Sequence, residues 1–63
     1  MPIEQLRGLY IASLMRYIEM EYDKVPEVVS QEMEEYFTDF FEQDPPVCYP
    51  NAAGVFYETF LRN

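Results

Sequence analysis

The sequence has no histidine, one cysteine, and four lysine or arginine residues in 63 positions. Without histidine it lacks the side chain that most often shuttles protons near neutral pH and most often binds metal ions. One cysteine excludes a disulfide within the chain. Because small secreted domains are usually rich in cysteine, the sequence predicts a protein of a reducing compartment, the cytoplasm.

Clustered cations and long apolar runs are also missing. Direct binding of nucleic acid or anionic lipid needs grouped Lys and Arg, and the formal net charge of −8 argues against both. The longest apolar stretch, Leu9 to Met15, is interrupted by Ser13 and is far shorter than the ~18 residues of a membrane span. No signal-peptide pattern is visible at the start. The expectation is a soluble chain with no membrane contact.

Apolar and aromatic residues are abundant. Hydrophobic residues make up 49% of the chain, with five Phe and six Tyr, which excludes a disordered acidic tail. A single domain of this size buries too little apolar surface to be strongly stable alone. Since an internal disulfide is excluded, we expect a partner chain to complete the fold, and a homodimer is the simplest closed assembly.

The first predicted helix covers residues 3–22, where apolar side chains recur at steps of three and four. In projection they cover about 240° of the helix, which is too wide for one packing neighbour. Arg7 lies within this apolar arc. It is expected either to pair with a carboxylate of a second copy or to extend its charged end into water.

The second predicted helix covers residues 26–43, with Pro26 in its first turn. Three prolines then predict an extended connector over 44–51. Asn51 is a candidate N-cap for a third helix over 52–62, in which Glu58 and Arg62 are spaced for an ion pair. Residues 55–61 are also rich in strand formers, so a strand is the alternative there.

These patterns predict an all-α fold: two long antiparallel helices and a short C-terminal helix after the proline-rich connector, forming one domain over 1–63. Oligomerisation is expected to complete the bundle. The predicted core consists of Leu14, Ile18, Val29, Met33, Phe37, Phe40, Phe56 and Phe60.

Two surfaces are candidate sites for a partner. The first is an apolar strip on the first helix, opposite the side that carries Ile11 and Met15; its residues are Leu6, Leu9, Tyr10, Tyr17 and Met20. The strip is wider than the predicted core needs, so it is a candidate contact surface. Simple partial exposure is the alternative.

The second surface is an acidic row on one edge of the second helix, formed by Glu32, Glu35, Asp39 and Glu42, which spans about 15 Å. Carboxylates bind hard cations, but no calcium-binding loop and no Glu-x-x-His spacing accompanies them. We therefore expect no metal and no cofactor. The row is expected either to mimic a nucleic-acid backbone towards a basic protein or only to keep the domain soluble.

No catalytic motif is present, so the sequence does not indicate an enzyme. Cys48 lies between two prolines and is interpreted as a small apolar residue packed under the connector, with an exposed redox contact as the alternative. The leading functional hypothesis is a non-enzymatic adaptor or inhibitor that holds itself or a basic protein through the first helix. The alternatives are an acidic nucleic-acid mimic and a structural subunit of a larger assembly.

Overall fold

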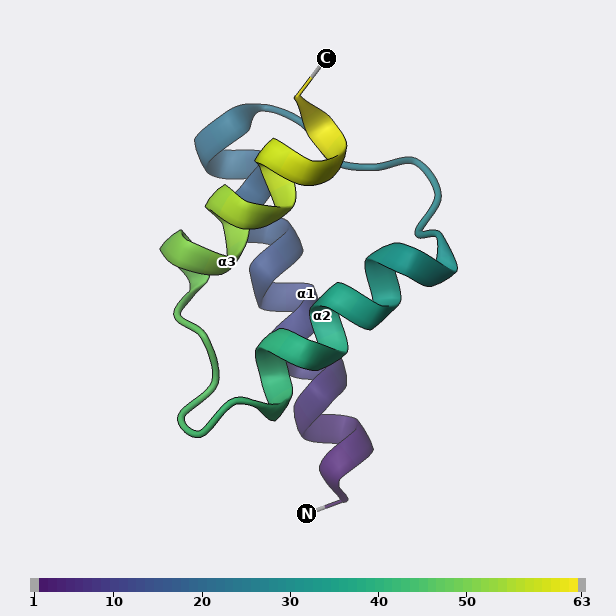
Figure 1. The fold of residues 1–63 in the computed structure, drawn as a ribbon, viewed down its shortest axis with the longest axis vertical. Helices are drawn as coiled ribbons and strands as arrows, with labels where there is room; N and C mark the ends of the chain where they lie inside the picture. The colour runs from purple at the N-terminus through teal and green to yellow at the C-terminus, as the bar shows by residue number, and fades with distance from the viewer. Residues whose placement is uncertain (1, 63) are drawn as a thin grey trace.

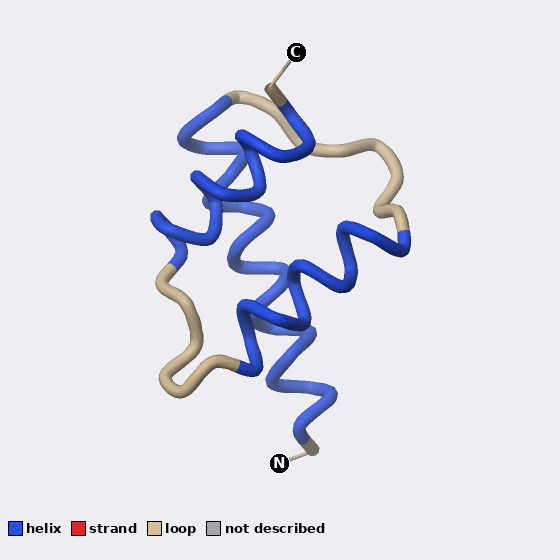
Figure 2. The backbone as a smooth tube through the Cα atoms, in the orientation of Figure 1, coloured by secondary structure: helices blue, strands red, loops and turns tan. Residues whose placement is uncertain are grey.

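The computed structural model describes residues 2–62, and over that range the chain is helical with two connecting loops and no strand (Figure 2). Its elements are α1 (Ile3–Tyr22), α2 (Gln31–Glu42), α3 (Tyr49–Phe56) and η1 (Tyr57–Leu61), a π-helical turn that continues α3. The predicted all-α class with three helices is confirmed. Residues 55–61 are helical, which removes the strand alternative.

The three helices are not arranged evenly around one axis. In Figure 1, α1 runs the length of the molecule, while α2 crosses its N-terminal half and α3 with η1 lies beside its C-terminal half. Both of the shorter elements cover the same side of α1, which lies behind them in this view. The opposite side of α1 therefore has no neighbour within the described chain.

The core lies where the three helices meet. Its buried members are Tyr10, Leu14, Ile18, Phe37, Phe40, Ala52, Ala53 and Phe56. The rings of Phe37 and Phe56 stack with centroids 4.9 Å apart. Ala52 and Ala53 are fully buried, and their small side chains let the backbone of α3 approach the other helices closely.

The first helix has the predicted bounds. It ends because Asp23 adopts a left-handed conformation with φ 54°, from which its backbone N–H donates to the carbonyl of Glu19. This is the usual hydrogen-bonding pattern of a helix C-terminus, here made by an aspartate in place of glycine.

The second helix begins at Gln31, later than the predicted start at Pro26. The reason is the cap: the Ser30 side chain accepts a hydrogen bond from the backbone N–H of Met33 at 3.2 Å, which satisfies a free donor of the first turn. The residues before the cap include β-branched Val28 and Val29, which are poor helix formers. Val29 is consequently 41% exposed and not part of the core, contrary to the prediction.

The connector is also shorter than predicted, because α3 begins at Tyr49 and not after Asn51. Cys48 occupies the N-cap position, Pro50 lies in the first turn, and Asn51 is a helical residue instead of the cap. Proline is tolerated there because the N–H that it lacks would have no helical partner. The connector is held by the backbone N–H of Val47, which donates to the carbonyl of Phe40 at 3.0 Å.

The C-terminal turn is widened, with the backbone N–H of Arg62 donating to the carbonyl of Tyr57. Within it the hydroxyl of Thr59 donates to the carbonyl of Val55 at 2.8 Å, a bond that is known to bend helices. The predicted ion pair between Glu58 and Arg62 is present at 2.7 Å. No helix in the described range is both long enough and apolar enough to cross a bilayer.

Candidate interaction surfaces

The apolar strip lies mostly on the open side of α1. Leu6, Leu9 and Met20 are 41%, 59% and 81% exposed, and Tyr17 is half-buried. On a helix, residues three and four apart lie on one face, so these side chains form one continuous surface. Within residues 2–62, Leu6, Leu9 and Met20 are exposed, whereas Tyr17 packs partly against the core.

Tyr10 is placed differently from the sequence-based interpretation, because its side chain belongs to the core. Its hydroxyl donates to the carbonyl of Val47 at 2.6 Å, and its ring lies 5.7 Å from that of Phe41 and 5.4 Å from that of Tyr49. Burial is the largest cause that raises the pKa of this phenol. Tyr10 therefore ties the connector to α1.

The strip continues onto the proline-rich connector. One open hollow of about 300 Å³ is lined by Ser13, Arg16, Tyr17, Met20 and Tyr49. A second, of about 450 Å³, is lined by Tyr10, Pro46, Val47, Cys48, Tyr49 and Pro50. Because Tyr49, the first residue of α3, lines both hollows, α1, the connector and the start of α3 present one joined surface. The sequence shows the apolar residues of the connector, but its three prolines predict only an extended conformation and not its position beside α1.

The thiol of Cys48 lies on this joined surface. Cys48 is exposed, so its interpretation as a residue packed under the connector is wrong.

The strip carries no carboxylate. Ser13 and Arg16 line the hollow that Tyr17 and Met20 share with Tyr49. Glu21 lies at its edge, where its charge adds to desolvation in raising the pKa of Tyr17. In a chain with a formal net charge of −8, this is a surface that a partner can approach without meeting a row of anions.

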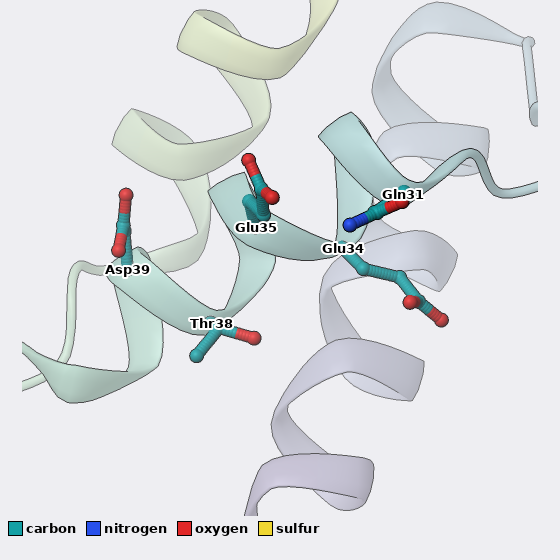
Figure 3. Close-up of a pocket in the computed structure, with 5 residues that line it drawn as sticks. All are labelled: Gln31, Glu34, Glu35, Thr38 and Asp39. Atoms are coloured by element: carbon teal, nitrogen blue, oxygen red, sulfur yellow. The ribbon is translucent and has the colours of Figure 1, made fainter.

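The acidic row lies on the outer face of α2, and all its members are exposed. Figure 3 shows that Glu35 and Asp39 extend to the same side of the helix, whereas Glu34 points to the other side, over α1. Gln31, Glu34, Glu35, Thr38 and Asp39 line an open hollow of about 330 Å³. Arg62 and Glu58 form the only ion pair between residues 2 and 62, so the carboxylates of α2 are unneutralised there.

These carboxylates do not converge. Within the described residues no three His, Cys, Asp or Glu side chains are grouped closely enough to hold a metal ion. Arg7 lies in a small hollow with Ile11, Glu34 and Thr38, at the junction of α1 and α2 and away from the apolar strip. The outer face of α2 is thus an extended band of negative charge.

Comparisons with known proteins match this chain to no family, no curated protein and no solved structure. Its function has to be inferred from the two outer faces.

Proposed function

We propose that the protein is a non-enzymatic interaction module, an adaptor or inhibitor, which holds another protein chain through the apolar strip of α1. The observation that carries this proposal is the exposure of Leu9 and Met20 on a side of the helix that the rest of the chain leaves uncovered. Single exposed apolar residues are ordinary on protein surfaces, but a continuous strip joined to an apolar hollow is typical of contact sites.

The total exposed area supports this proposal. The chain exposes 4678 Å², whereas a compact monomer of 7.6 kDa exposes about 4,300 Å². The exposed side chains include the apolar Leu6, Leu9 and Met20. Covering these side chains with another chain removes them from water and stabilises both the complex and this small domain.

The charge distribution determines which partners are favoured. A neutral or basic surface can reach the strip, and a basic partner gains further attraction from the carboxylates of α2. A partner whose own contact surface carries carboxylates is disfavoured. The exposed lone thiol of Cys48 is compatible with a reducing compartment, and a cytoplasmic location is part of this proposal.

The test uses Leu9→Glu combined with Met20→Glu. Each substitution puts a charge at the centre of the proposed contact, where desolvation is costly, so association should weaken about 30-fold or more. The matched control is Gln31→Glu with Gln43→Glu. It adds the same charge at two exposed positions, the first residue of α2 and the residue that follows α2. Light scattering and affinity capture with the full chain report association. Equal association of both variants and the native protein would contradict the proposal.

A second candidate function rests on the acidic row. A band of unneutralised carboxylates along one helix resembles the charge spacing of a nucleic-acid backbone, so α2 is a candidate decoy for a basic nucleic-acid-binding protein. The test replaces Glu32, Glu35 and Glu42 by Gln and Asp39 by Asn. Capture of basic proteins at moderate salt should be lost. Unchanged capture would eliminate this candidate.

A further inference from the structure

The apolar strip is symmetric about Ser13. Leu6 and Met20 lie seven residues before and after it, and Leu9 and Tyr17 lie four residues before and after it. When two identical helices cross in antiparallel orientation about a two-fold axis, residues at equal distances from the crossing point meet each other. Crossing at Ser13 places Leu6 opposite the partner copy's Met20, and Leu9 opposite its Tyr17.

We propose that the occupant of the strip is a second copy of this chain, bound antiparallel along α1 with the two helices crossing at Ser13. This inference rests on the proposed function and specifies its partner. The side chains at these four positions, Leu6, Leu9, Tyr17 and Met20, are largely apolar. Each therefore contacts an apolar side chain of the second copy.

The residue at the crossing point is small, exposed and polar. Helices approach most closely where small side chains face each other, and the larger residues on both sides then interdigitate. The two Ser13 hydroxyls meet at the axis, where each can donate to or accept from the other. A large residue at this position would hold the helices apart.

Two copies of this chain repel each other overall, but the repulsion is weakest at the strip, and charge favours one orientation there. Two chains that each carry −8 repel each other least where they meet through a surface without carboxylates, and the strip is such a surface. A parallel pair in register would place the two Arg16 side chains at the same level, which is a like-charge contact. The antiparallel pair separates them to opposite sides of Ser13.

The extent of the strip sets the strength of the dimer. From Leu6 to Met20 the helix rises about 21 Å, so the contact falls in the small class of interfaces, below ~1,200 Å² in total. Such contacts are typical of weak, reversible association. We expect a dimer that dissociates on dilution and leaves the strip available to other chains.

Disulfide cross-linking in the full-length chain tests this geometry. In a Cys48→Ser background, Ser13→Cys places one thiol at the two-fold axis, within the Cα separation of 4.4–6.8 Å that a disulfide requires. The control is Ala12→Cys, also exposed but turned about 100° away on the same helix. Under mild oxidation Ser13→Cys should cross-link at least about tenfold faster than Ala12→Cys, because rate depends on thiol access and approach.

Orientation is tested by mixing single variants in the same background. Leu6→Cys mixed with Met20→Cys should give a cross-linked heterodimer, whereas Leu6→Cys alone should not cross-link. Equal rates for Ser13→Cys and Ala12→Cys, or self-linking of Leu6→Cys, would overturn the proposed pairing. Circular dichroism of each variant confirms that it is folded.

The result also separates this inference from the proposed function. If the native chain stays monomeric and the Ser13 variant does not cross-link, but Leu9→Glu with Met20→Glu still abolishes capture of a different protein, the occupant is that protein. The second copy is then excluded, while the interaction function stands. If the glutamate substitutions change nothing in either assay, both proposals fail.

Discussion

The outer faces of α1 and α2 differ although both helices lie at the surface of the same small domain. Every apolar side chain of α2 is buried or half-buried, and its outer face is acidic. The outer face of α1 exposes Leu6, Leu9 and Met20. Residues 2–62 therefore cover the apolar side of α2 but leave Leu6, Leu9 and Met20 of α1 exposed, and this contrast is the basis for the proposed partner of α1.

The largest expected effect is on stability, and it should differ between a core residue and a residue of the strip. Phe37 is fully buried and stacks on Phe56, so Phe37→Ala should lower the free energy of unfolding by about 3–5 kcal/mol, a large share of the stability of so small a domain. Leu9→Ala should lower it by less than about 1 kcal/mol, since the side chain is 59% exposed. Urea unfolding at low protein concentration measures both. Equal losses would show that the strip is part of the core.

A smaller effect concerns the hydroxyl of Tyr10, which holds the connector. Tyr10→Phe removes the hydrogen bond to the Val47 carbonyl and should cost about 1 kcal/mol of unfolding free energy. Burial raises the pKa of Tyr10 above the ordinary 10.0, so above about pH 10 the unfolded chain releases this proton while the folded chain keeps it. Stability should then fall as pH rises through this range.

The measurement is urea unfolding of the native protein and Tyr10→Phe between neutral pH and pH 11. The difference in unfolding free energy between the native protein and Tyr10→Phe should become smaller above about pH 10, because the stabilisation by the protonated Tyr10 phenol is lost there. A constant difference across the whole range would contradict the assigned role of the buried hydroxyl.

The smallest effect concerns the acidic face. Glu35 lies three residues from Glu32 and four from Asp39, so Glu35→Gln removes like-charge contacts and should raise stability by a few tenths of a kcal/mol at low salt. The gain should shrink as salt is added. Thermal unfolding at two salt concentrations checks this. A loss of stability would show that Glu35 has a structural partner.

Local sequence signals predicted much of this fold. The bounds of α1, the amphipathic character of α2, and the ion pair of Glu58 with Arg62 follow from helical spacing. Most of the predicted core is buried as expected, including Leu14, Ile18 and Phe37.

The remaining features depend on contacts that the sequence does not display. The sequence offers two start signals for α2, Pro26 and Ser30. Only the structure shows that Ser30 is the N-cap, because its side chain accepts a hydrogen bond from the backbone N–H of Met33. Tyr10 has the helical phase of a strip residue, but the connector returns to place the Val47 carbonyl within reach of its hydroxyl. The exposure of Leu6, Leu9 and Met20 follows the sequence pattern, whereas the position of Tyr49 next to Tyr17 and Met20 depends on the path of the connector.

The most direct test of the contrast between the two helices is a dilution series of the native protein followed by backbone amide chemical shifts. The strip account predicts concentration-dependent shifts that centre on Leu9, Ser13 and Met20, with the amides of Glu35 and Asp39 unmoved. Shift changes confined to α2 would contradict it. So would the absence of any shift change, both in the dilution series and after a partner is added.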